Sequence, residues 1–120
     1  MRIRLGLLID FVEIYNRLPN TPDDWQSLDA ISKGALPARA LKAEAKAIIA
    51  FKQIFKRFVN YQVGSEDRFV QMVAYRLRVQ PRDLSKEQTA LKMFVEVYNS
   101  LPANGFAWSI IRALAYSGVK

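Results

Sequence analysis

The 120-residue chain contains no cysteine and no histidine. The absence of cysteine excludes disulfides, thiolate metal sites and cysteine nucleophiles. Histidine is the commonest general base and the commonest metal ligand, so its absence removes most hydrolase and zinc-site mechanisms. The five glycines are scattered and form no phosphate-binding loop. We therefore predict that the protein is not an enzyme and uses no metal ion and no cofactor.

Long hydrophobic runs are also missing. The apolar run that starts at Leu5 ends at Asp10, which is too short for the core of a signal peptide. The uncharged stretch 101–111 is about half the length of a membrane span. Because 51% of the residues are hydrophobic, the chain can still form a core. We expect a single cytoplasmic domain over residues 1–120, with no membrane partner.

The formal net charge of +7 is concentrated in the middle of the chain. Residues 39–82 hold ten of the 18 Lys and Arg residues but only three of the 11 Asp and Glu residues. The flanking segments 1–38 and 83–120 are nearly neutral. A localised excess of positive charge is typical of a surface that binds nucleic acid.

A nine-residue motif occurs twice, as FVEIYNRLP at 11–19 and as FVEVYNSLP at 94–102. At the same offset of 83 residues, Trp25 aligns with Trp108. We interpret this as an internally duplicated helical hairpin, with one repeat at 1–34 and the other at 84–118. The motif itself is either a paired binding surface built from its Glu and Asn residues or a helix end. We favour the helix end, because the apolar residues can pack and Asn and Pro can terminate a helix.

Each repeat reads as helix, turn, helix. In the first repeat, apolar spacing predicts a helix over 3–18, and Thr21 caps a second helix that stops at Gly34. In the second, a helix starts at 83–85, with Ser85 and Gln88 as a capping box, and the last helix runs to about residue 117. The acidic pairs at 23–24 and 66–67 fit helix starts better than metal sites.

Two further helices are expected between the repeats, at 37–61 and 66–79, and they make up the basic central part of the chain. In the first, apolar residues from Leu41 to Phe58 and Val59 share a broad arc and basic residues lie opposite, with Glu44 and Lys52 as exceptions. In the second, Tyr75 and Arg76 fall roughly opposite the apolar face. The alternation at 75–79 and at 2–5 also fits short strands. Our main prediction is an all-α, compact bundle of five to six helices.

The predicted nucleic-acid contacts are the basic row of the first central helix, extended by an arginine and tyrosine mixture further along. These residues are Arg39, Lys42, Lys46, Lys52, Lys56, Arg57, Arg68, Tyr75, Arg76, Arg78 and Arg82. Lysine and arginine would contact phosphates, and tyrosine would stack on bases. The alternatives are an ordinary solvated face, or a surface for an acidic protein or lipid.

A resemblance follows from the basic residues of this central part. The residues that carry it are Arg39, Lys42, Lys46, Lys56, Arg57, Arg68 and Arg76. In size, charge and helix content, without a shared motif, the chain resembles the small subunits of CRISPR effector complexes, which serve antiviral defence. The resemblance implies a helical ribonucleoprotein subunit that holds nucleic-acid backbone and contacts other protein subunits. Small phage and plasmid DNA-binding proteins look similar at this level.

The sequence thus predicts a non-catalytic subunit that binds nucleic acid largely independently of sequence. We expect no small-molecule substrate. One alternative is a small phage or plasmid adaptor or inhibitor that binds an acidic protein surface. A self-assembling structural protein is a further alternative.

Overall fold

The computed structural model describes residues 5–119, which fold into six α-helices; this range contains no β-strand. The helices are α1 (Leu5–Tyr15), α2 (Pro22–Ser32), α3 (Leu41–Phe55), α4 (Gly64–Tyr75), α5 (Leu84–Tyr98) and α6 (Gly105–Tyr116). The prediction of an all-α bundle with up to six helices is confirmed. Over the same range, no helix is both long enough and apolar enough to cross a lipid bilayer.

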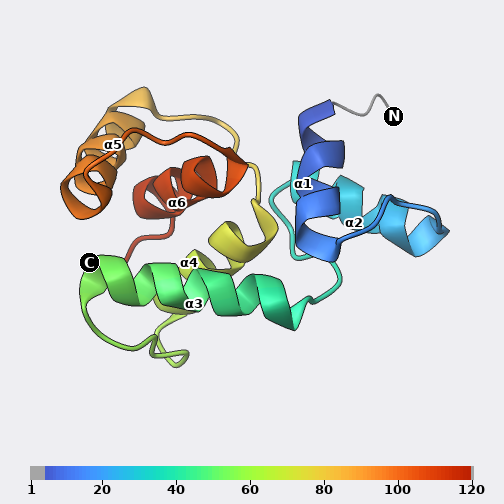
Figure 1. The fold of residues 1–120 in the computed structure, drawn as a ribbon, viewed down its shortest axis with the longest axis horizontal. Helices are drawn as coiled ribbons and strands as arrows, with labels where there is room; N and C mark the ends of the chain where they lie inside the picture. Colours follow the sequence, from blue (N-terminus) through green and yellow to red (C-terminus); the bar gives the residue numbers. More distant parts are fainter. Residues whose placement is uncertain (1–4, 120) are drawn as a thin grey trace.

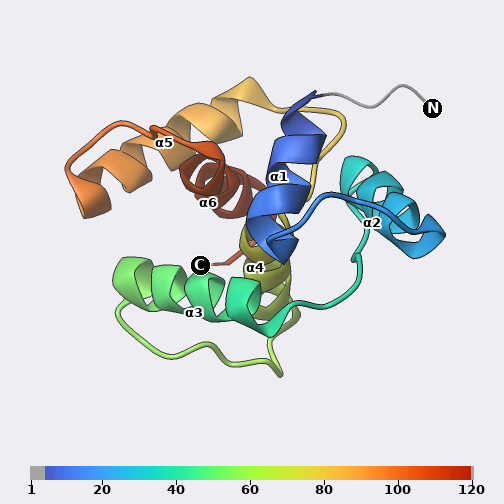
Figure 2. The same cartoon turned by 45° about the vertical axis from the view of Figure 1, so that its right-hand side comes forward.

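Helix α4 occupies the centre of the bundle (Figure 1). It packs against α3 and α6 and also touches α1. Helices α1 and α2 lie at one side of the molecule and α5 and α6 at the other, as Figure 2 also shows. Aromatic rings join α3 to α4, because the Phe51 and Phe69 rings meet edge to face with their centroids 5.4 Å apart. The core therefore surrounds α4, and few side chains of α4 reach solvent.

Side-chain caps begin three of the helices. At α2, the Thr21 hydroxyl accepts a hydrogen bond from the Asp24 amide at 3.1 Å, and the Asp24 carboxylate accepts one from the Thr21 amide at 3.3 Å. This capping box confirms the predicted start of α2. At α5 the cap is Asp83, whose carboxylate accepts a backbone hydrogen bond from the first turn. The predicted capping box at Ser85 is wrong, because Asp83 already starts the helix.

The two central helices are shorter than predicted. Helix α3 covers 41–55 of the predicted 37–61, because residues 35–40 run as a loop and Lys56 takes a left-handed conformation that ends the helix. Helix α4 covers 64–75 rather than 66–79, because Arg76 is also left-handed, with φ 52°. Residues 77–79 form no strand, so the alternative strand at 75–79 is wrong. Its counterpart at 2–5 lies outside the described residues except for Leu5, which is helical.

The two copies of the repeated motif have matching local structure. The first helix of each hairpin ends at a left-handed asparagine, Asn16 with φ 59° and Asn99 with φ 55°. The Phe and Tyr rings of the motif pack with centroids 4.6 Å apart in the first copy and 4.7 Å apart in the second. The motif forms a helix end in both copies. The duplication itself stays a prediction, since the hairpins pack differently: α6 lies against α4, whereas α2 packs mainly on α1.

Two large apolar side chains that were predicted to be buried are exposed. Leu41 is 80% exposed and Phe58 is 74% exposed. Leu41 occupies the first position of α3, and Phe58 follows its end, so neither belongs to the buried core.

Candidate nucleic-acid interface

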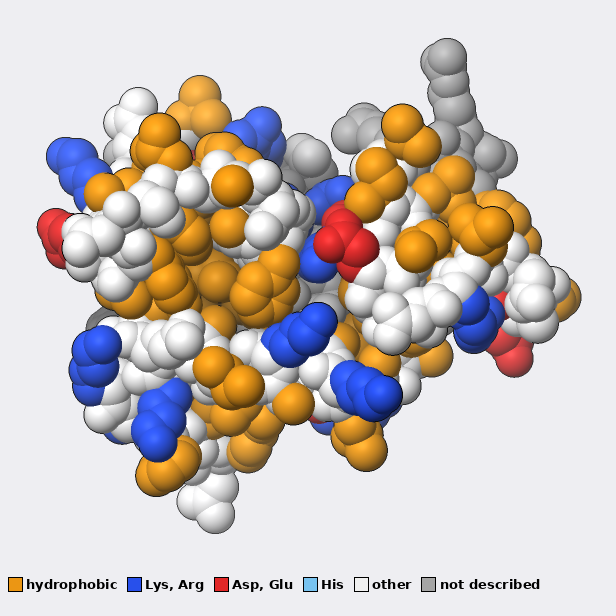
Figure 3. Space-filling model, in the orientation of Figure 1, with side chains coloured by type: hydrophobic (Ala, Val, Ile, Leu, Met, Phe, Trp, Pro, Cys, Tyr) orange, Lys and Arg blue, Asp and Glu red, His pale blue; other side chains and the backbone are white. Residues whose placement is uncertain are grey.

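Four exposed lysines follow α3 and its C-terminal cap: Lys42, Lys46, Lys52 and Lys56, here called the α3 lysine row. None of them forms an ion pair with another residue in 5–119. Figure 3 shows basic side chains spaced over this helix. Lys52 lies outside the apolar arc after all, and its Nζ is 4.3 Å from the centroid of the exposed Phe58 ring. The predicted row of lysines is thus present on the surface.

The one negative charge of α3 lies on its buried side, where an arginine balances it. Glu44, its only acidic residue, is buried. The Arg39 guanidinium donates two hydrogen bonds to the Glu44 carboxylate, at 2.5 and 3.0 Å, and the Tyr75 hydroxyl donates another. The hydrogen bonds from Arg39 hold the pKa of Glu44 below its usual value. No carboxylate of α3 therefore opposes the α3 lysine row.

Three of the predicted phosphate-binding arginines are exposed but already paired with a carboxylate. Besides Arg39, Arg57 Nη2 lies 2.9 Å from Glu66 Oε2, and Arg82 Nη2 lies 2.6 Å from Glu87 Oε1. Paired guanidinium groups attract phosphate less strongly than isolated ones, because the carboxylate balances their charge. These arginines can border a nucleic-acid site, but they are weaker anchors than the lysines.

The prediction that Arg76 faces solvent is wrong. Its side chain is 7% exposed, and its Nη1 lies 3.0 Å from both Asp10 Oδ1 and Glu13 Oε1. Arg78 Nη2 binds the other oxygen of the same aspartate, Asp10 Oδ2, at 2.7 Å. Both arginines therefore join the segment after α4 to α1. Arg76 is a structural residue, and Arg78 is only partly accessible.

The predicted stacking role of Tyr75 is contradicted in the same way. Tyr75 is fully buried, its hydroxyl accepts a hydrogen bond from the Ala40 amide at 2.9 Å, and burial raises its pKa to about 12. Arg68 is half-buried, and both of its terminal nitrogens donate to the Gly34 carbonyl at 3.3 Å. These outcomes share one cause: α4 is enclosed by its neighbours, so the side of α4 assigned to solvent packs inward.

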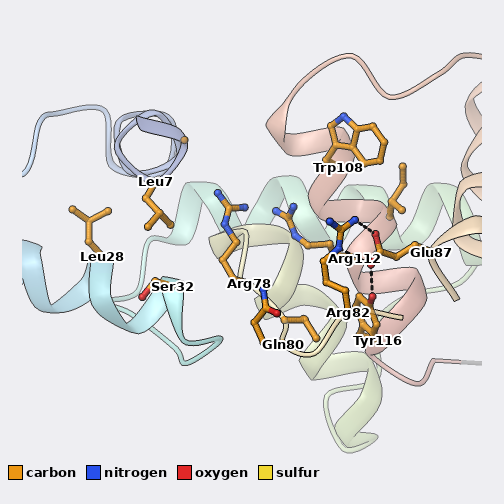
Figure 4. Close-up of a pocket in the computed structure, with 13 residues that line it drawn as sticks. Leu7, Leu28, Ser32, Arg78, Gln80, Arg82, Glu87, Trp108, Arg112 and Tyr116 are labelled. Carbon is orange, nitrogen blue, oxygen red and sulfur yellow. Dashed lines mark hydrogen bonds and ion pairs between the residues drawn. The ribbon is translucent and has the colours of Figure 1, made fainter. Parts of the chain in front are cut away.

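A cavity of about 780 Å³ opens between the two hairpins. Its wall combines residues 78–82, which follow α4, with side chains from α1, α2, α5 and α6. The guanidinium groups of Arg78, Arg82 and Arg112 all face this cavity, as Figure 4 shows. Trp108 and Tyr116 of α6 complete the wall on that side. A cavity of this size is in the range of small-molecule sites, roughly 300–1,000 Å³.

Sequence reasoning did not select Arg112. It is the only charged residue of α6, and a lone charge in an apolar helix is the signal that could have singled it out. Its Nε is buried and has no hydrogen-bond partner within residues 5–119. Burial, followed by the neighbouring Arg78, lowers the pKa of the Arg112 guanidinium to about 10. Arg112 therefore carries a positive charge that its surroundings do not balance.

A smaller hollow of about 290 Å³ adjoins the N-terminal end of the α3 lysine row. Lys42 and Lys46 line it together with Glu13 and Asn16 of the α1 end. Hydrogen bonding to Arg76 holds the pKa of Glu13 below its usual value, so this carboxylate stays charged but engaged. The hollow thus has two lysines available to an anion.

Hydrogen bonds lower the pKa of five carboxyl groups. Arginine side chains are the main cause except at Glu66, where the Asn60 amide comes first. These groups, here called the ion-paired carboxylates, are Glu13, Asp24, Glu44, Glu66 and Glu87. Within residues 5–119, acidic side chains form no cluster that could hold a metal ion.

No known protein-family model, curated protein or solved structure matches the chain. Its function therefore has to be inferred from its own side chains.

Proposed function

We propose that the chain binds nucleic-acid backbone through the α3 lysine row, without reading base sequence, as a non-catalytic subunit of a larger complex. The observation that carries the proposal is that this row is exposed and that no carboxylate of residues 5–119 is paired with it. Phosphates are suited to such a row, because neutralising them with lysines releases condensed counterions.

The length of the row supports contact with several successive phosphates. From Lys42 to Lys56 the chain advances about 20 Å at the helical rise of 1.5 Å per residue. This is roughly six times the 3.4 Å rise between phosphates along one strand of duplex DNA. Lysine contacts of this kind set the position of a strand and carry no sequence information.

Helix α1 supports a place in a larger complex. Leu5, Ile9 and Val12 share one helical face and are exposed, whereas Asp10 is buried. Exposed apolar side chains on one helical face suit a contact with another protein. A basic surface for nucleic acid and an apolar surface for protein neighbours suit the small subunit of a CRISPR effector complex. We propose that place for this chain.

The test is a fluorescence-anisotropy titration with labelled single-stranded DNA, duplex DNA and single-stranded RNA at two salt concentrations. The test variant replaces Lys42, Lys46 and Lys52 with Gln. The control variant replaces Lys33, Lys86 and Lys92 with Gln. These lysines are exposed and lie outside α3. Both variants lose three positive charges, so the change in net charge is matched; of the six lysines, only Lys33 has a carboxylate partner within residues 5–119, Asp29 at 2.9 Å.

We expect the α3 variant to lose binding and the control variant to keep most of it. For duplex DNA, the slope of log K against log salt should flatten by about 0.9 for each phosphate that the variant no longer neutralises. Equal losses in the two variants would show that only net charge matters and would refute the α3 site. If no probe binds and an acidic protein partner does, the adaptor alternative replaces the proposal.

A further inference from the structure

The cavity between the hairpins is separate from the α3 lysine row. None of the four lysines lines it, and its cations are the arginines of residues 78–82 and of α6. The charges around it do not balance. Four arginines gather at or beside the cavity: Arg76, Arg78, Arg82 and Arg112. Within residues 5–119 they pair with three carboxylates, those of Asp10, Glu13 and Glu87.

Each of these carboxylates already forms an ion pair with an arginine. Asp10 binds Arg76 and Arg78 through its two oxygens, at 3.0 and 2.7 Å. The Glu87 carboxylate, which also lines the cavity, accepts hydrogen bonds from Arg82 at 2.6 and 3.1 Å and another from the Tyr116 hydroxyl. The guanidinium left over is that of Arg112, which forms no ion pair within residues 5–119.

An unpaired guanidinium at this depth is unfavourable without an anion. Its Nε is buried without a partner, and it lies near the like charge of Arg78, which is why its pKa is lowered. One uncompensated guanidinium beside two paired ones at a cavity fits a site for a negatively charged ligand. A phosphate group fits the need, because the planar fork of a guanidinium donates two parallel hydrogen bonds to phosphate oxygens.

The remaining wall of the cavity includes several apolar side chains beside the polar Ser32 and Gln80. Trp108 lines one side of the cavity, and Leu7 and Leu28 line the opposite side, as Figure 4 shows. Trp108 is half-exposed and so can offer a ring face to a planar group at the cavity mouth. A ligand that carries both a phosphate and a planar apolar ring would use both parts of the wall.

We propose that this cavity binds a nucleotide, with its phosphate held by Arg112 and Arg78 and its base packed against Trp108. The proposal is independent of the proposed function, since it uses none of the α3 lysines. It also departs from the prediction of no small-molecule substrate. Tertiary packing explains this difference, because the cavity forms only where α6 meets the segment that follows α4.

The test is isothermal titration calorimetry of the full chain with AMP, in a phosphate-free buffer of low ionic strength. Adenosine serves as the probe that has the same base and no phosphate. AMP should bind with a stoichiometry of one, and adenosine should bind at least about tenfold more weakly, as expected when hydrogen bonds to a charged group are absent. Absence of AMP binding at millimolar concentration, or equal affinity for adenosine, would overturn the proposal.

The variant Arg112→Met removes the unpaired charge and keeps an apolar stem of similar length. It should bind AMP at least about tenfold more weakly, the loss expected for a charged hydrogen bond. Its melting temperature without ligand should equal or exceed that of the parent, which separates lost binding from lost folding. Lys92→Met is the matched control, because it removes the same charge from an exposed position outside the cavity. Undiminished AMP affinity in Arg112→Met would overturn the proposal.

The two proposals fail separately. The α3 variant described above should bind AMP like the parent, and Arg112→Met should bind nucleic acid like the parent. Loss of AMP binding in the α3 variant would place the nucleotide on α3 and overturn the assignment of the cavity.

Discussion

Replacing Asp10 with asparagine should destabilise the fold strongly, although it changes only one non-hydrogen atom and removes one charge. Asp10 is 6% exposed and holds Arg76, itself 7% exposed, at 3.0 Å and Arg78 at 2.7 Å. Removing one partner from a buried ion pair costs about 3–5 kcal/mol, because the other charge remains buried. Arg76 keeps a second partner, Glu13, at 3.0 Å, so we expect the low end, about 3 kcal/mol.

The size of this effect can be read in thermal and urea unfolding followed by circular dichroism. At about 2.1 cal/mol/K of unfolding entropy per residue, a loss of 3 kcal/mol corresponds to a fall of roughly 12 °C in melting temperature for this chain length. Asp29→Asn is the matched control. Its partner Lys33 is 2.9 Å away, but both side chains are accessible, so its cost should stay below about 0.5 kcal/mol. If the two substitutions cost the same, Asp10 does not hold a buried charge and the reasoning fails.

Three further predictions test the fold. Gly34→Ala should lower the free energy of unfolding by more than about 1 kcal/mol, because φ is +77° and the new Cβ would lie 2.5 Å from the Arg78 carbonyl oxygen. Gly64→Ala should be neutral or stabilising, since no other atom lies within 4 Å of the new Cβ. Urea unfolding that ranks the two variants the other way would contradict the backbone geometry. Phe51→Ala should cost about 3–5 kcal/mol in the same assay and Phe58→Ala under about 1 kcal/mol, because the first ring is buried and the second is exposed; similar losses would contradict the assigned core. The ion-paired carboxylates have lowered pKa values, so they stabilise the folded state above the ordinary pKa of such groups, and this stabilisation is lost as pH falls through the lowered values. The melting temperature should therefore decline from about pH 5 downward. A melting temperature that stays constant down to about pH 2 would exclude these pairs.

Much of the helical structure could be predicted because its signals are local. Thr21 directly precedes the helix that it caps, so this cap could be predicted from the sequence; the reciprocal hydrogen bond to Asp24 was seen only in the structure. The end of α2 could also be predicted, because Gly34, two residues after its last residue, adopts a positive φ without strain. The outward position of Lys42 and Lys46 followed from helical spacing alone, because α3 has one buried side and one open side.

The accessibility of the arginines could not be predicted in this way. Arg76 and Asp10 are 66 residues apart in the sequence, and nothing local to either residue indicates the ion pair. Helical spacing assigned Tyr75 to solvent on the assumption that α4 has one open side, but α4 is enclosed by α1, α3 and α6. Its lone charge marked Arg112 as unusual in an apolar helix, but the cavity beside it is formed by distant segments and could not be predicted from α6 alone.

The sequence by itself determined the helices, the Thr21 cap and the basic character of the central segment, because these properties depend on neighbouring residues and on composition. Tertiary structure decided which of the positive charges remain without a carboxylate partner. The reason is that burial and ion pairing depend on contacts between distant segments. Those contacts pair most of the predicted arginines with carboxylates. They leave the lysines of α3 and the guanidinium of Arg112 without a carboxylate partner within residues 5–119.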